Sequence, residues 1–118
     1  MPWNVVQTSG VREWFTELLK TDEPSFLNIM TAVALLAEKG PELGRPLVDH
    51  IKGSKIHNLK ELRPGSSGRT EIRILFCFDP LRQAVLLVAG DKSRNWSGWY
   101  RKAIPRAEKL YEEYLKER

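Results

Sequence analysis

The stretch RTEIRILFCFDPLRQAVLLVAG, residues 69–90, decides the fold because it holds two strand patterns and the turn between them. Side chains in 69–79 alternate between two faces, with Ile72, Ile74, Phe76 and Phe78 on one and Arg69, Glu71, Arg73, Leu75 and Cys77 on the other. The turn is DPLR (79–82). QAVLLVAG (83–90) has no polar alternation, which is typical of a strand buried on both faces. The stretch therefore predicts two antiparallel neighbours in a sheet.

A third strand is predicted upstream of this pair. In KIHNLKELR (55–63) the side chains follow a period of two, and PGSSG (64–68) is a turn signal, so that the two runs form a hairpin. The preceding segment PELGRPLVDHIKGS (41–54) is rich in proline and glycine and is predicted to be a connection. A three-stranded antiparallel meander results.

Two helices are predicted before the meander. The apolar residues at 11, 14, 15, 18 and 19 have the spacing of one helix face, and a second stripe runs from Phe26 to Ala37. Asp22 is placed to cap the second helix, with Pro24 in its first turn, and Gly40-Pro41 ends it. WNVV (3–6) before them predicts a short edge strand.

A helix is also predicted at the C-terminus, where Pro105 suits the first turn and an apolar stripe is formed by Ile104, Ala107, Tyr111, Tyr114 and Leu115. The sequence thus predicts a single α+β domain over residues 1–118. Its antiparallel sheet of three to four strands packs against two N-terminal helices, and a C-terminal helix follows. The two helices would cover one sheet face, and the polar side chains of the hairpin would lie on the other, partly open face.

Composition narrows the class of protein. The formal net charge is +4, and the basic residues are concentrated between residues 45 and 106, which permits an RNA or acidic-protein partner. The only cysteine, Cys77, cannot form an internal disulfide and is predicted to pack as a small hydrophobe. No apolar run is long enough to span a bilayer, and the N-terminus lacks the layout of a signal peptide. We therefore expect a cytoplasmic protein.

Metal and nucleotide-triphosphate chemistry have little support. His50 and His57 are seven residues apart, no second cysteine is available, and there is no HExxH motif. The GSSG turn lacks the lysine that follows a phosphate-binding loop. We expect no metal and no cofactor.

The remaining candidate is a charged aromatic cluster around the hairpin. Arg73 lies within the apolar string EIRILF, where a buried guanidinium needs a partner or a ligand. A structural salt bridge with Glu61 or Glu71 is one explanation, and an anion site is the other. Glu61 and Arg63 share a strand face because they are two residues apart.

A basic aromatic segment follows the third strand, and its residues are Lys92, Arg94, Trp96, Trp99 and Tyr100. The cations leave the strand where they can converge on the hairpin, and the rings can stack on bases of single-stranded RNA. The tryptophans can equally seal the entry of the last helix. Together these groups suit metal-free RNA cleavage, in which a ribose 2′-hydroxyl attacks the adjacent phosphate. Arg73 and Lys92 would stabilise charge, and Glu61 or Tyr100 would move protons.

Three stretches follow one another along the chain: NLKELRPGSSGRTEIRILFCFDP, AVLLVAGDK and IPRAEKLYEEYL. In this order, and over nearly the whole chain, the sequence resembles the HigB-type, phage-derived branch of the RelE/ParE toxin superfamily. The resemblance implies a compact RelE-like fold. It also implies the toxin of a type II toxin–antitoxin system, commonly a ribosome-dependent mRNA endonuclease that inhibits translation. The implied partners are the ribosome, mRNA and a helix-turn-helix antitoxin (HigA-like), with DNA reached only through that antitoxin.

The resemblance also implies roles for single residues. Arg73 matches the arginine that contacts the scissile phosphate, Lys92 the basic residue that ends the next strand, and Tyr100 the aromatic that stacks on or activates the nucleotide. The lysine register of the first hairpin strand falls on Lys60 or Glu61. Four residues are predicted to bind RNA: Lys60, Arg63, Arg94 and Trp99.

Two other functions stay open from sequence. A related branch of the superfamily poisons DNA gyrase, so the chain can be a non-enzymatic inhibitor of a protein target. It can also be a degenerate toxin that acts only as the partner of its antitoxin.

Overall fold

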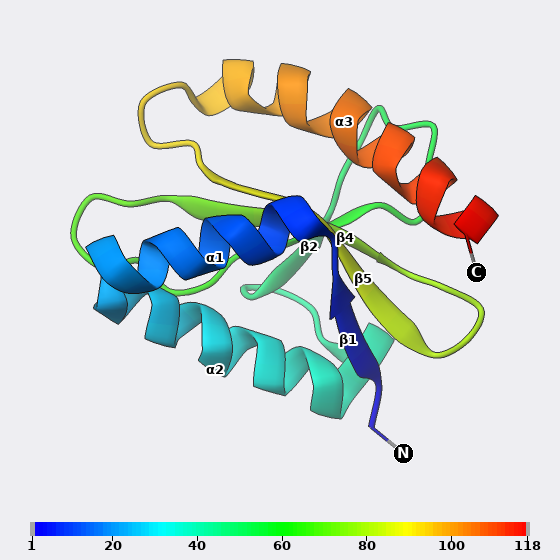
Figure 1. Ribbon diagram of the computed structural model, residues 1–118, viewed down its shortest axis with the longest axis horizontal. Helices are drawn as coiled ribbons and strands as arrows, with labels where there is room; N and C mark the ends of the chain where they lie inside the picture. The colour runs from blue at the N-terminus through cyan, green and yellow to red at the C-terminus, as the bar shows by residue number, and fades with distance from the viewer. Residues whose placement is uncertain (1, 118) are drawn as a thin grey trace.

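The computed structural model describes residues 2–117, which form five strands, three α-helices and one short 3₁₀ helix (Figure 1). In chain order these are β1 (Asn4–Gln7), α1 (Ser9–Thr21), α2 (Glu23–Lys39), η1 (Gly40–Glu42), β2 (Val48–His50), β3 (Lys60–Leu62), β4 (Ile72–Phe78), β5 (Gln83–Asp91) and α3 (Trp96–Glu117). The predicted α+β class is confirmed. None of the helices in this part of the chain has the length and hydrophobicity that crossing a membrane would require.

The five strands form one mixed sheet in the order β1-β5-β4-β3-β2. The predicted meander β3-β4-β5 is present and antiparallel. The sheet is larger than predicted because β2 lies within 41–54, which the sequence indicated to be a connection, and pairs with β3. An entirely antiparallel sheet is also wrong, since β1 runs parallel to β5. A four-residue apolar run carries no signal for the direction of its pairing.

The helix boundaries follow from local hydrogen bonds. Thr8 Oγ1 accepts from the backbone N–H of Val11 at the start of α1. The predicted cap of α2 is confirmed, because the Asp22 carboxylate accepts from the backbone N–H and the hydroxyl of Ser25 at 3.3 and 2.6 Å. Gly40 ends α2 at a φ of +57°, where an added Cβ would overlap the indole of Trp3.

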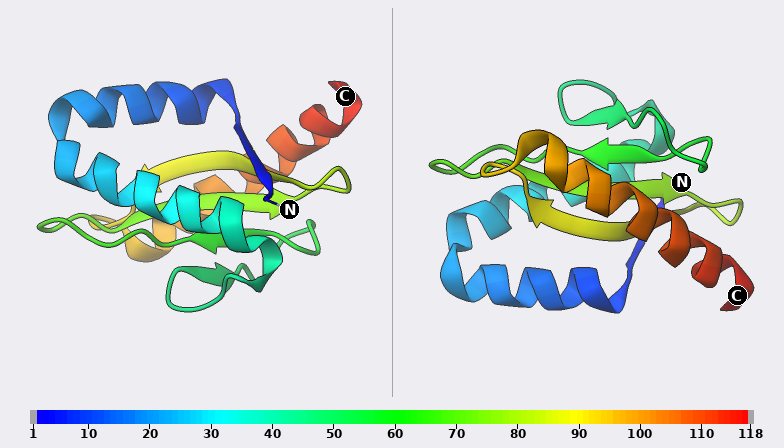
Figure 2. Two further views of the ribbon diagram at one scale, coloured as in Figure 1. Left: turned by 90° about the horizontal axis from the view of Figure 1, so that it is seen from below. Right: turned by 90° about the horizontal axis from the view of Figure 1, so that it is seen from above.

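Both faces of the sheet are covered, which corrects the expectation of a partly open face (Figure 2). The helices α1 and α2 pack on the face that carries Ile72, Ile74 and Phe76, as the alternation of β4 predicted. The helix α3 packs on the opposite face, over Leu75 and Cys77. Cys77 is buried, and burial raises the pKa of its thiol to about 12, so it remains a protonated, apolar group.

A bulge explains why β5 shows no alternation of polar and apolar residues. Leu75 pairs with Val88 and Phe76 with Leu86, so that Leu87 is the extra residue on β5. Leu87 and Val88 consequently both pack toward α3, although they are adjacent in sequence. The strand can therefore supply apolar side chains to both cores without a strict period of two.

Two element boundaries differ from the sequence expectation. Only Lys60–Leu62 of the predicted strand 55–63 is extended, and residues 51–59 form a loop. The helix α3 begins at Trp96, so that Pro105 lies in its interior rather than in its first turn. Pro105 is exposed, so its ring points away from the sheet and the core contacts of α3 continue past it.

Candidate functional site

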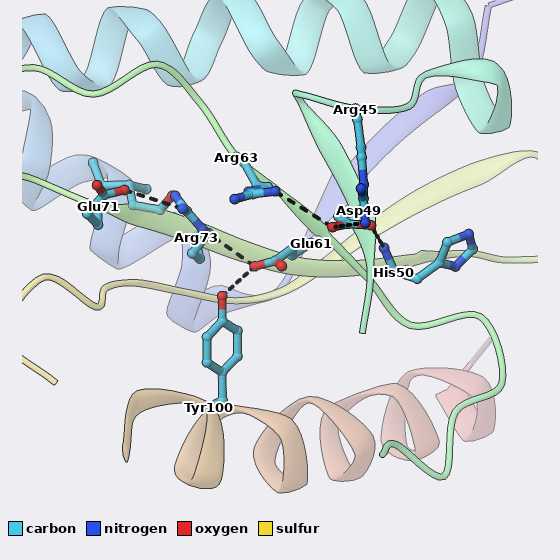
Figure 3. Close-up of polar contacts among 9 residues, drawn as sticks. Arg45, Asp49, His50, Glu61, Arg63, Glu71, Arg73 and Tyr100 are labelled. Atoms are coloured by element: carbon cyan, nitrogen blue, oxygen red, sulfur yellow. Dashed lines mark hydrogen bonds and ion pairs between the residues drawn. The ribbon is translucent and has the colours of Figure 1, made fainter. Parts of the chain in front are cut away.

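Four of the predicted side chains meet between the sheet and the first turns of α3. Glu61 comes from β3, Arg73 from β4, Lys92 directly follows β5, and Tyr100 lies in α3. We call these four residues the Glu61–Arg73 cluster. The sheet register explains the meeting: Glu61 is paired with Leu75, and Arg73 is two residues before Leu75 on the same face. Figure 3 shows Tyr100 reaching up from α3 to Glu61 beside Arg73.

Arg73 is the central cation of the cluster and is only 5% exposed. Its Nη1 donates to the backbone oxygen of Ile72 at 2.8 Å, and its Nη2 donates to Glu71 Oε2 at 3.3 Å. Its Nε lies 3.6 Å from Glu61 Oε1, in an ion pair, yet it is buried and has no hydrogen-bond acceptor. Both salt bridges anticipated from sequence therefore exist, and one N–H of the guanidinium remains unsatisfied, which is uncommon for a buried group.

Glu61 connects Arg73 to Tyr100 and is 8% exposed. The Tyr100 hydroxyl donates to Glu61 Oε1 at 2.6 Å, the same oxygen that faces Arg73. Burial, the hydrogen bond to Glu61 and the negative charge of Glu61 raise the pKa of Tyr100 to about 12. Tyr100 is consequently a hydrogen-bond donor at neutral pH and is poorly suited to act as a base.

Lys92 is the second cation and is 7% exposed. Burial lowers the pKa of its ammonium group, and the nearby charge of Arg73 lowers it further. The ammonium lies 4.2 Å from the ring centroid of Trp96 and 4.9 Å from that of Tyr100. These cation–π contacts hold the charge of Lys92 at the entrance of α3.

The four residues predicted to bind RNA are not all brought to the cluster. Arg63 lies at its edge, with Nη1 3.7 Å from Asp49 Oδ2, and Arg94 is exposed in the loop before α3. Lys60 lies on the opposite sheet face, with its ammonium 5.3 Å from the ring centroid of Phe78. Trp99 packs closely on the backbone of Gly90 and helps to seat α3.

One charged group was missed because its strand was missed. Asp49 on β2 pairs with Arg45 at 3.2 Å and with Arg63 at 3.7 Å (Figure 3). The backbone N–H of His50, followed by the Arg45 side chain, lowers the pKa of the Asp49 carboxyl. Its only sequence signal was the short apolar context PLVDHI. Asp49 orients Arg63 at the rim of the cluster.

No metal centre is formed by the described residues, among which no group of three or more His, Cys, Asp or Glu side chains is placed to hold an ion. His50 and His57 are both exposed, at the end of β2 and in the loop that follows it. The chemistry that the cluster itself offers is different. Two buried cations can attract an anion, a carboxylate can accept a proton, and a protonated tyrosine can donate one.

A mixed sheet enclosed by two helices on one face and one on the other, with a buried arginine–glutamate–tyrosine cluster under the single helix, defines a small α+β protein. Residues 14–112 match the family described as phage derived protein Gp49-like (DUF891). The chain belongs to this family.

Two relatives are similar over most of the chain. It is 49% identical to "Putative toxin HigB2" of Mycobacterium tuberculosis over 94 residues, which cover 80% of this chain and 47% of that protein. The chain thus spans about half the length of that relative. It is 45% identical to "Putative toxin HigB3" of the same organism over 111 residues, which cover 94% of this chain and 92% of that protein. The resemblance to HigB-type toxins is confirmed.

Proposed function

We propose that this chain is the toxin of a type II toxin–antitoxin pair. The names of the two relatives and the membership of the Gp49-like family support this class. The expected partner is a short helix-turn-helix antitoxin of the HigA type, through which alone the toxin would contact DNA. The toxin would act in the cytoplasm, where its antitoxin and target are made.

We further propose that the toxin is a ribosome-dependent mRNA endonuclease. The observation that carries this proposal is the buried Nε of Arg73, which has no hydrogen-bond acceptor although it lies beside Glu61 and close to a second buried cation. A phosphate oxygen would satisfy that N–H and would be attracted by both cations. Single-stranded mRNA presented by the ribosome offers such a phosphate next to a reactive 2′-hydroxyl.

The cluster supplies each group that the cleavage needs. Glu61 accepts the proton of the 2′-hydroxyl as its oxygen attacks phosphorus, and Arg73 and Lys92 stabilise the charge that develops on the phosphate oxygens. The bond to the 5′-oxygen breaks, and Tyr100 donates the proton that this oxygen requires. Because Tyr100 and Glu61 share a hydrogen bond of 2.6 Å, the proton on Glu61 can then return to Tyr100. The products are a 2′,3′-cyclic phosphate and a 5′-hydroxyl.

The four residues predicted from sequence to bind RNA have different roles in this proposal. Arg63 and Arg94 lie where they can bind flanking phosphates of the mRNA. Lys60 can contribute only if the RNA passes round β2 and β3 to the opposite face. Trp99 acts through the position of α3, because its ring is packed on Gly90.

The test is Arg73→Ala compared with Arg63→Ala, expressed without antitoxin. Arg73→Ala removes the N–H donors expected to meet the phosphate and should lower cleavage about a hundredfold or more, abolishing growth arrest. Arg63→Ala removes a rim charge and should weaken cleavage only a few-fold. Circular dichroism and antitoxin binding establish that each variant is folded. A folded Arg73→Ala variant that still cleaves transcripts would overturn the assignment.

Mapping of transcript 5′ ends after induction separates the proposed function from the alternatives. A nuclease leaves cuts within translated codons. An inhibitor of gyrase arrests growth without such cuts and raises DNA-damage signalling. A degenerate toxin binds its antitoxin and arrests nothing.

A further inference from the structure

Trp96 is the only exposed side chain among the Phe, Trp and Tyr residues of 2–117, with 55% of its surface accessible. It is the first residue of α3 and lies directly against Lys92, whose ammonium is 4.2 Å from its ring centroid. A single exposed apolar side chain is ordinary on a protein surface. An exposed indole in contact with a buried cation of the Glu61–Arg73 cluster is a more specific arrangement.

The other two rings near the cluster are engaged in holding α3 on the sheet. Trp99 packs on Gly90 so closely that an added Cβ there would lie 2.4 Å from its Nε1. Tyr100 donates its hydroxyl to Glu61 and packs edge-on against Trp99, with 5.1 Å between ring centroids. Of the three, Trp96 is the ring with the most surface available to a ligand.

We infer that Trp96 is the stacking platform for a nucleobase of single-stranded RNA, next to the phosphate that Lys92 and Arg73 attract. The inference rests on the proposed function for its substrate and adds how that substrate is held. The Lys92 ammonium is 4.2 Å from the ring centroid of Trp96 and 4.9 Å from that of Tyr100, so its charge would lie next to a base stacked on the indole. Stacking on an indole accepts every base and favours the larger purines.

The binding test uses a short single-stranded RNA with 2′-O-methyl riboses, which cannot be cleaved by the proposed route. Trp96→Ala should raise its Kd about tenfold or more, whereas Trp96→Phe, which keeps a ring, should stay within about threefold. Leu115→Ala is the matched control, because it removes an exposed apolar side chain from the other end of the same helix. An oligonucleotide of abasic riboses should bind the native protein weakly and lose little more with Trp96→Ala, as expected when the base and the ring are partners.

Cleavage of unmodified mRNA on ribosomes is measured with the same variants. A failure of the stacking inference can then be distinguished from a failure of the nuclease proposal. Trp96→Ala should raise the half-saturating concentration by a larger factor than it lowers the maximal rate, since stacking acts in binding and Lys92 keeps its contact with Tyr100. If Trp96→Ala binds the methylated RNA as the native protein does, the stacking inference is overturned whatever the cleavage result. If the native protein binds that RNA through Trp96 but cuts no transcript, the nuclease proposal fails and the stacking inference stands. If the native protein does not bind the RNA, the stacking inference is wrong.

Discussion

Arg73 is buried and ion-paired, and its Nε–H still has no hydrogen-bond acceptor. Its guanidinium is buried, and the carboxylates of Glu61 and Glu71 compensate its charge at 3.6 and 3.3 Å. A buried ion pair is weak evidence for a contribution to stability, because desolvation offsets much of the attraction. The unsatisfied Nε adds to that cost. This arrangement supports the proposed role of Arg73 in binding a phosphate.

The hydrogen bond between Tyr100 and Glu61 gives a pH-dependent prediction at the scale of one residue. Tyr100→Phe leaves the buried Glu61 carboxylate without this donor and should reduce the free energy of unfolding by about 1–3 kcal/mol at neutral pH. The folded pKa of Tyr100 is raised from 10.0 to about 12, so the unfolded chain releases the proton first and stability falls between these values. The difference between native and variant should therefore shrink over that range.

Urea unfolding at several alkaline pH values measures this difference. The raised pKa of Cys77 also makes stability fall as pH rises, but it does so in both proteins and cancels in the comparison. A difference that stays constant or grows with pH would contradict the assigned protonation of Tyr100.

At the scale of elements, α3 is fixed at three places along its length. Trp99 packs on Gly90 near the start, and Glu108 in the middle accepts from the hydroxyl of Ser54 at 2.8 Å and from the backbone N–H of Lys55. Tyr114 near the end donates to Asp79 Oδ2 at 2.7 Å. These anchors hold a helix with an internal proline against the sheet, and they determine where Tyr100 and Trp96 lie.

The Asp79 anchor should give stability that is lost in acid. Burial alone would raise the pKa of the Asp79 carboxyl, but hydrogen bonds from Tyr114, Gln83 and the N–H of Leu81 outweigh it and lower the pKa. A lowered folded pKa means that the contribution is present above the ordinary value of about 3.9 and disappears as pH falls through the folded value. Asp79→Asn should cost about 1–3 kcal/mol at neutral pH and flatten this acid dependence.

Thermal or urea unfolding as a function of pH checks the prediction. Glu112→Gln is the matched control, because Glu112 is an exposed acid on α3, the helix that Asp79 anchors, and its Oε1 lies 3.5 Å from the Lys116 ammonium in a surface contact. It should change stability little. An Asp79→Asn protein with the native acid dependence would show that the anchor is unimportant.

At the scale of the whole molecule, the sheet separates two apolar cores that depend on different helices. One core lies under α1 and α2, and the other is closed by Ala103 and Ala107 of α3 over Leu75 and Leu87. The second core and the Glu61–Arg73 cluster share the same sheet face. Folding of α3 onto the sheet therefore assembles the candidate site.

Removal of α3 should consequently unfold more than the C-terminus. A chain that ends at Asn95 would leave the apolar side chains of β4 and β5 on one face open to water, and we expect poor solubility and strong binding of a hydrophobic dye. A chain that ends at Tyr114 keeps all three anchors and should remain folded. Soluble yield, dye fluorescence and circular dichroism distinguish these outcomes. A soluble, cooperatively folded chain ending at Asn95 would refute the dependence on α3.

Much of the fold was predictable because it depends on local patterns. The alternation in β4, the Asp22 cap and the apolar stripes of α1 and α2 are properties of neighbouring residues, and the structure bears them out. The start of α3 and the existence of β2 were not predictable in this way. The helix α3 has proline as its tenth residue, and β2 is a three-residue strand within a proline-rich segment. Both exist because tertiary contacts outweigh weak local preferences.

The residue types of the candidate site could also be predicted from sequence. The sequence shows a charged side chain within one apolar strand, and it shows a basic aromatic segment directly after the next strand. Which of them meet was decided only by the tertiary structure. Glu61 and Tyr100 are 39 residues apart, and their contact requires both the β3–β4 register and the packing of α3. The same packing places the half-buried Trp99 against Gly90 and leaves Trp96 exposed over Lys92. Sequence thus determined the chemical groups and the sheet faces, whereas long-range packing set their distances, their burial and their partners.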